Sequence, residues 1–153
     1  MPKTLKVATL DTYFREAVQA ATESTCQFRN AWYKGAEFQR CPECGNQPGG
    51  GDDVAHFYGR RYRAGRWWPD NVAMLCRKAH SYIDAHEPVK VGFFGRLLGE
   101  EGLEELVKRM HGSVKYTPAD RWDIGQHYKE EKARIEEERK NGKTGTIKLI
   151  SYE

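Results

Sequence analysis

Residues 41–86 read CPECGNQPGGGDDVAHFYGRRYRAGRWWPDNVAMLCRKAHSYIDAH, and the rest of the chain is organised around them. This stretch holds three of the four cysteines, three of the five histidines and a tight group of arginines. In chain order it offers a cysteine pair, a histidine after a glycine-rich turn, an asparagine, a third cysteine and a short polar segment. Such residue types bind metal ions and polyanions, so this stretch is the candidate functional region.

The cysteines have the spacing of a two-knuckle zinc site. Cys41 and Cys44 lie in a CPECG turn, and Cys76 follows much later in the chain. In the second knuckle, the other cysteine position is occupied by Ala79. Cys26 and His80 are therefore the candidates for a fourth ligand; in the alternative reading, three cysteines pack as small apolar residues without an ion. We predict a structural zinc site whose fourth ligand is open.

His56 and Asn71 are the candidate catalytic residues. His56 lies on a predicted strand, VAHF, directly after the glycine loop. A metal-dependent nuclease needs a neutral imidazole to take a proton from water, and a divalent ion to stabilise charge at the phosphate. Asn71 is placed to tie the loop after this strand to the next segment. The alternative for His56 is an ordinary structural histidine.

His80 and Asp84 are the candidate ligands for that divalent ion. They stand four residues apart on a predicted helix, RKAHSYIDAH, so they share one face. An imidazole and a carboxylate, with the other positions left to water, suit magnesium, manganese, nickel or zinc. The alternative is a hydrogen-bonded surface pair.

Basic residues concentrate in the same stretch although the net charge of the chain is only +3. Between His56 and His80 a single acid, Asp70, opposes six bases: Arg60, Arg61, Arg63, Arg66, Arg77 and Lys78. Counterion release favours binding of such a stripe to nucleic acid, and interleaved tyrosines and tryptophans can stack on bases. The alternative is a solvated arginine-rich loop.

The length of 153 residues predicts one domain. We divide the chain into a helical segment (1–30), the metal and nuclease core (31–88), a helical region (89–142) and a tail (143–153). No run of about 18 apolar residues occurs, so no membrane span is expected. The N-terminus does not resemble a signal peptide, which predicts a reducing cytoplasm and free or metal-bound thiols.

Flanking elements are expected on both sides of the core. Upstream we predict a helix over 10–25 with Asp11 as its N-cap, and a short strand over 35–40. Downstream we predict one or two amphipathic helices within 91–112, then a helix that begins at Thr117-Pro118 and ends near Asn141-Gly142. The second half of that last helix is charged all round, which predicts a solvated arm or a partner surface. The tail is expected to be a strand or disordered.

Several segments, in order, resemble the phage NinG/Rap recombination proteins, a branch of the HNH (ββα-metal) nuclease superfamily. They are LDTYFREAVQAAT, RCPECG, AHFYGRRYRAGRWWPDNV, GLEELV and VKYTPADRWDIGQHYKEEK, and together they span roughly residues 10 to 140. The most specific part is the histidine followed by Arg60-Arg61, then Arg66-Trp67 and Asn71-Val72.

The resemblance implies an α+β fold with an HNH-like core, a zinc knuckle and flanking helices. It implies a metal-dependent endonuclease of phage recombination that cuts branched DNA in the cytoplasm of a bacterial host, with a homodimer plausible for symmetric cutting. His56 then takes the general-base position, Asn71 the middle position and His80 the metal position.

Two departures keep other readings open. Ala55 stands where many such sites carry a metal ligand, and Asp53 is expected on the opposite face of a regular strand. Ala79 stands at the last zinc-cysteine position. The alternatives are a non-catalytic zinc-knuckle module that binds DNA or RNA, and an assembly partner that acts through the charged helix.

Overall fold

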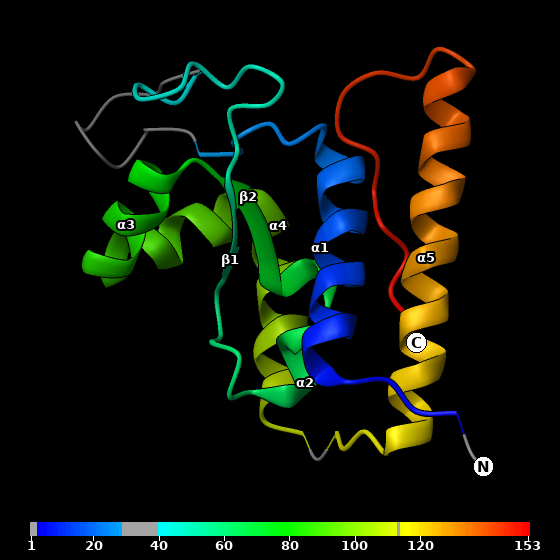
Figure 1. Cartoon of the computed structure of the whole chain (residues 1–153). Helices are drawn as coiled ribbons and strands as arrows, with labels where there is room; N and C mark the ends of the chain where they lie inside the picture. The colour runs from blue at the N-terminus through cyan, green and yellow to red at the C-terminus, as the bar shows by residue number, and fades with distance from the viewer. Residues whose placement is uncertain (1–2, 29–39, 113) are drawn as a thin grey trace.

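The fold is a small two-stranded sheet surrounded by helices, so the predicted α+β class is confirmed. The computed structural model describes residues 3–28, 40–112 and 114–153. In chain order the elements are α1 (Val7–Thr22), β1 (Asp53–His56), α2 (Arg63–Arg66), the 3-10 turn η1 (Pro69–Asn71), β2 (Val72–Leu75), α3 (Arg77–Ala85), α4 (Glu87–Met110) and α5 (Pro118–Lys140). Figure 1 shows α1 and α5 side by side, with α3 at the far side of the strands.

The two strands are antiparallel and are followed directly by α3. Their register pairs Asp53 with Leu75 and His56 with Val72. The connection between them, residues 57–71, contains α2, η1 and four of the predicted DNA-contacting bases, Arg60, Arg61, Arg63 and Arg66. The order strand, long loop, strand, helix therefore places the basic loop and α3 at the two ends of β1.

Strand β2 is buried on both faces and joins two hydrophobic clusters. Val72 and Met74 pack in a cluster with α1 and α5. Ala73 and Leu75 pack in a second cluster with the cysteines, Phe93 and Phe94 of α4, and Ile83 of α3. Because side chains alternate along a strand, one apolar strand serves both clusters.

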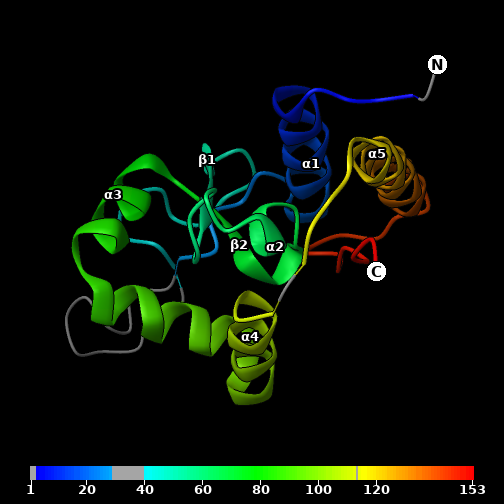
Figure 2. The same cartoon turned by 90° about the horizontal axis from the view of Figure 1, so that it is seen from below.

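Helix α5 is a core helix, so the prediction that its second half is a solvated arm is wrong. Ile124, Tyr128 and Ile135 are fully buried in the cluster with α1. Both views show α5 alongside α1 (Figures 1 and 2). These residues form a narrow apolar stripe along one side of the helix. The stripe is hard to recognise in the sequence because most of the surrounding residues are charged. The buried Glu131 is compensated by Arg134 at 2.7 Å and by the amide of Ile150 at 2.6 Å.

Local sequence signals predicted both ends of α5 correctly, but they misplaced the start of α1. Thr117 caps α5, as the sequence predicts, and the structure adds a reciprocal hydrogen-bonded box with Asp120; Asn141 is the C-cap. By contrast, α1 begins at Val7 after Lys6, so Asp11 lies inside the helix and is not its N-cap. The side chain of Asp11 instead contacts the basic loop, as described below.

The other flanking elements differ in detail from expectation. Helix α4 covers both predicted amphipathic helices and is interrupted at Gly99, whose φ of 76° is left-handed. Most of the predicted strand over 35–40 lies outside the described residues. The tail runs without regular structure and buries Ile147 and Leu149 against α1 and α5. Within the described parts of the chain, every helix is too short or too polar to cross a membrane.

The packing of α5 predicts that its second half contributes to stability. We expect Ile135→Ala to lower the free energy of unfolding by about 2–5 kcal/mol, because it leaves a cavity between α1 and α5. Ile150→Ala is the matched control, since this isoleucine is 56% exposed, and should change stability by less than about 0.5 kcal/mol. Urea titrations followed by circular dichroism measure both. Equal effects of the two variants would show that α5 is not packed.

Candidate functional site

Four cysteine sulfurs lie together at one side of the sheet. The sulfur atoms of Cys26, Cys41, Cys44 and Cys76 are all within 4.8 Å of one another, and none forms a disulfide. Cys26 is therefore the fourth member of the cluster that the sequence left open. His80, the other candidate, has different neighbours. The group thus holds four cysteines, one more than the alternative of cysteines packed without an ion counts.

The size of the cluster fits one tetrahedral ion. Zinc–sulfur bonds of about 2.3 Å place neighbouring sulfurs of a tetrahedron about 3.8 Å apart. The sulfurs of Cys41 and Cys76 are 3.8 Å apart. Four thiolates with no open position are the ligand set of a structural zinc site rather than of a catalytic one.

Hydrogen bonds from neighbouring segments bring the four cysteines together. The amide of Gly45 donates to the carbonyl of Cys41 at 2.8 Å, and Gly45 has a left-handed φ of 70°, which closes the CPECG turn. The side chain of Asn46 bonds the amide of Cys41 and the carbonyl of Cys26. Gln27 pairs with Met74 of β2 through two hydrogen bonds, so Cys26 lies beside the strand that leads to Cys76.

Burial and crowding affect the acidity of these thiols. Burial raises the pKa of Cys26 and of Cys76, and the neighbouring cysteines raise both further. Several thiolates in so small a volume repel one another unless a cation lies between them. The donor set therefore fits a divalent ion whose binding releases protons.

His56 lies on β1 with one ring nitrogen held by backbone. Its Nε2 is 3.1 Å from the carbonyl oxygen of Arg66. Because a carbonyl can only accept, Nε2 carries the hydrogen and Nδ1 carries the lone pair. Burial lowers the pKa of His56 below its usual value, an effect larger than that of the hydrogen bond, which raises it. The ring is therefore neutral at neutral pH.

Asn71 holds the loop that follows His56. Its Oδ1 accepts from the amide of Tyr58, and its Nδ2 donates to the carbonyls of Tyr58 and Gly65, each at 2.9 Å. A Cβ at Gly65 would lie 2.9 Å from this amide group, so only glycine fits there. Asn71 is fully buried, and it ties the two ends of the loop together, as the sequence suggested.

His80 has a carboxylate at each ring nitrogen. Its Nδ1 lies 2.9 Å from Asp53, and its Nε2 lies 3.2 Å from Asp84. The two carboxylates lie at different ring nitrogens, Asp53 at Nδ1 and Asp84 at Nε2. A single ion bound to one of these nitrogens therefore cannot also bind both carboxylates. Asp84 also pairs with Lys90 at 3.4 Å and is half exposed, whereas Asp53 is only 19% exposed.

His56, His80 and Asp53 line one cleft of about 440 Å³ beside α1. Asp53 thus borders the same cleft as His56, although the two residues are three apart on β1. Strand β1 pairs only with β2 among the described residues, so its other edge is open, and side chains from both of its faces can border the cleft. Asp84 is not part of the cleft wall.

The predicted DNA-contacting bases divide into two groups. Arg60, Arg61 and Arg63 are exposed on the loop after His56, and Arg60 borders the cleft together with Arg15 of α1. The others have acidic partners: Arg66 binds Asp11 at 2.7 Å, Arg77 binds Asp53 at 2.9 Å, and Lys78 binds Glu43 at 3.4 Å. The exposed trio is thus the group best placed to meet phosphates.

The loop tryptophans are structural. Trp67 is buried in the cluster with α1 and α5, and the guanidinium of Arg109 covers Trp68 at 3.6 Å from the ring centre. Tyr62 is 37% exposed and lies beside Arg61. Among the five aromatic residues of the loop, Tyr62 is the one that is exposed and offers a surface for stacking.

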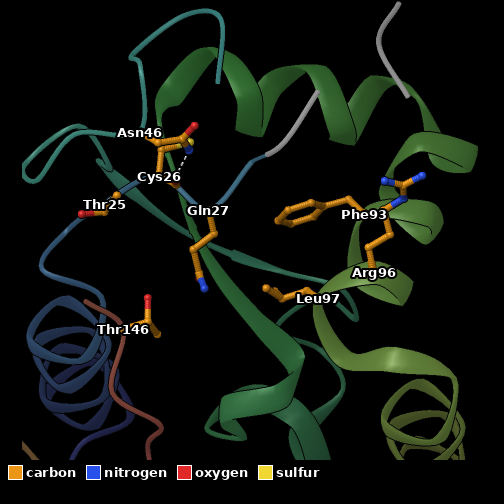
Figure 3. Close-up of a pocket in the computed structure, with 8 residues that line it drawn as sticks. All are labelled: Thr25, Cys26, Gln27, Asn46, Phe93, Arg96, Leu97 and Thr146. Atoms are coloured by element: carbon orange, nitrogen blue, oxygen red, sulfur yellow. Dashed lines mark hydrogen bonds between the residues drawn. The ribbon is translucent and has the colours of Figure 1, made fainter. Parts of the chain in front are cut away.

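A second cavity, of about 500 Å³, lies beside Cys26. Figure 3 shows Gln27 and Asn46 on one side of it and Phe93 and Arg96 of α4 on the other. Its described lining contains no carboxylate and no imidazole, which are the side chains that most often act as general bases. The cleft with His56 is the better candidate for chemistry.

Two members of the site could not be assigned from sequence. Cys26 was one of two candidates for the fourth ligand, and because it lies outside any repeat of the knuckle spacing, only its position beside β2 distinguishes it from His80. Asp53 was set aside because of strand alternation, yet a carboxylate three residues before the candidate base was a usable signal.

The cysteine cluster predicts that Cys26, and not His80, completes a zinc site. Purified protein should contain about one zinc ion per chain. Cys26→Ser should lose most of this zinc and unfold at lower temperature, because a structural ion stabilises only the folded state. His80→Ala, the matched control, should retain it. Elemental analysis with thermal unfolding decides; zinc loss in His80→Ala alone would contradict the assignment.

Comparison with protein-family models, curated proteins and solved structures returned no match. The resemblance to the NinG/Rap proteins is therefore carried by the quoted motifs alone. The geometry provides two candidate sites: a four-cysteine cluster, and a cleft that combines a histidine, a histidine–carboxylate pair and exposed arginines.

Proposed function

We propose that the protein is a metal-dependent endonuclease of the HNH type, which hydrolyses phosphodiester bonds in DNA. The observation that carries this proposal is one cleft whose lining includes both His56, with one nitrogen bonded to backbone, and the His80–Asp53 pair. The sequence β1, loop, β2, α3 supports an HNH-like core, because it puts the base on a strand and the metal ligand on the following helix.

His56 is the general base. The carbonyl of Arg66 accepts from Nε2 and leaves Nδ1 with a lone pair that can take a proton from water. The lowered pKa keeps this lone pair available at neutral pH. Asn71 acts at a distance: it closes the loop whose backbone holds the ring.

His80 and Asp53 are the residues that would hold the catalytic ion. One imidazole and one carboxylate leave several positions for water and phosphate oxygens, which suits magnesium or manganese. Bound there, the ion would stabilise negative charge on the phosphate and the leaving oxygen. Asp53 replaces Asp84 in this role because it borders the cleft of His56 and Asp84 does not.

The exposed arginines favour nucleic acid as the substrate. Arg60 of the loop and Arg15 of α1 both line the cleft, and Arg61 and Arg63 are exposed on the same loop. Phosphate contacts of this kind bind DNA without regard to sequence. Branched DNA, such as a four-way junction, is the proposed substrate, on the basis of the resemblance to recombination proteins.

A non-catalytic DNA- or RNA-binding module is the second candidate. The observation in its favour is the ion pair between Arg77 and Asp53, which occupies the carboxylate proposed to bind metal. Arg77 is 75% exposed, so its side chain is free to move to a phosphate when DNA arrives. Binding without cleavage in magnesium, manganese, nickel and zinc would favour the module.

The role of His56 predicts a separation of cutting from binding. His56→Ala should slow cleavage of a four-way junction by about 10²–10⁴-fold, the usual contribution of a general base, while the Kd for junction DNA stays within about twofold. In the wild type, kcat/KM should fall only below pH 6.5, because burial holds the pKa of His56 under that ordinary value. Wild-type cleavage rates in His56→Ala would refute the assignment.

The choice between two carboxylates predicts different metal dependence for matched variants. Asp53→Asn should raise the manganese concentration for half-maximal cleavage by at least about tenfold, since it removes a charged ligand. Asp84→Asn, on the other ring nitrogen of His80, should have the smaller effect. Metal titrations of cleavage measure both. A larger effect of Asp84→Asn would indicate that the ion binds at Nε2 of His80 and not at Nδ1.

A further inference from the structure

The orientation of His56 depends on one carbonyl at the end of a very short helix. Helix α2 has four residues and ends at Arg66, whose carbonyl accepts the hydrogen bond from His56. So short a helix is not stable by itself, so outside contacts must hold it in place. What fixes Arg66 therefore also fixes the imidazole.

Asp11, on the second turn of α1, supplies three of those contacts. Its carboxylate accepts from Nε of Arg66 at 3.0 Å and from a terminal nitrogen of Arg66 at 2.7 Å. The same carboxylate accepts from the indole nitrogen of Trp67 at 2.9 Å. A two-point arginine–carboxylate pair fixes direction as well as distance. Partial burial alone would raise the pKa of Asp11, but these bonds outweigh burial and lower it, so the carboxylate is charged.

Helix α5 holds the same dipeptide from another side. The hydroxyl of Tyr128 donates to the carbonyl of Trp67 at 2.5 Å, and Tyr128 is fully buried. The side chains of Arg66 and Trp67 are thus bonded to Asp11 of α1, and the backbone carbonyl of Trp67 is bonded to Tyr128 of α5. The remaining freedom of the Arg66 carbonyl is small, and Asp11 is the charged contact that restrains it.

We propose that Asp11 is a positioning residue for the general base, acting through Arg66 and Trp67 to hold the carbonyl that orients His56. This role rests on the proposed function only because it treats His56 as a base. The contacts that link Asp11 to His56 through Arg66 do not depend on the proposed function. It also assigns Arg66 to the support of the site rather than to contact with phosphate.

The test compares Asp11→Asn with Glu16→Gln. Asparagine keeps the shape of Asp11 but removes the charge and places an amide against the guanidinium. Glu16 is the matched control, because its ion pair with Lys132 at 3.5 Å joins the same helix to α5 and does not touch the loop. With four-way junction DNA and manganese, Asp11→Asn should lower kcat by up to about 100-fold with an unchanged Kd for DNA. Glu16→Gln should lower neither.

A second measurement does not need cleavage. The Nε2 hydrogen of His56 should give a protected imidazole NMR signal in the wild type and in Glu16→Gln, and should exchange too fast to observe in Asp11→Asn. Urea titrations check that both variants are folded. An intact signal and a kcat within twofold of the control would overturn the proposal.

The two proposals fail in different ways. If wild-type protein cuts no DNA but the imidazole signal is lost in Asp11→Asn, the nuclease is wrong and the positioning link is right. A double-mutant cycle with Arg66→Met adds a direct check: Asp11→Asn should have little further effect on kcat when Arg66 is already gone, because the two act as one unit. Additive losses would show that Asp11 acts by another route.

Discussion

The two-sided burial of β2 is the constraint on which the rest of the structure depends. Val72 and Met74 face the cluster of α1 and α5, while Ala73 and Leu75 face the cysteines and α4. A slip of one residue would exchange these sets and fill neither cluster correctly. Since β1 pairs with β2 in this register, the same constraint places His56 between the basic loop and α3.

The two halves of the candidate site support each other through the start of α3. Cys76 directly follows β2, and its sulfur accepts from the amide of Ala79 as the cap of α3. His80 stands on the next turn and faces Asp53. An ion held by the four sulfurs would therefore anchor the base of the helix that carries the proposed catalytic ligand. The cysteine cluster and the proposed catalytic ligand are thus separated by one helical turn.

Local patterns predicted the elements better than their surroundings. The Thr117-Pro118 start of α5 was predicted correctly because a capping box is complete within four residues. The environment of α5 was not, because a stripe of a few apolar side chains among many charges gives little contrast in composition. Asp11 resembled an N-cap for a similar reason: an acid near a helix start is a common signal, and its real partners lie far along the chain.

The sequence by itself determined the chemical inventory and its order: three of the cysteines, the strand with His56, the asparagine after the basic loop and the helix with His80. Only the tertiary structure decided that Cys26 joins the cysteine cluster, that Asp53 rather than Asp84 borders the cleft, and that Asp11 supports Arg66. Pairing along β2 and packing between α1 and the loop create these contacts. Such long-range contacts leave no periodic trace in the sequence, since neither partner needs a particular neighbour.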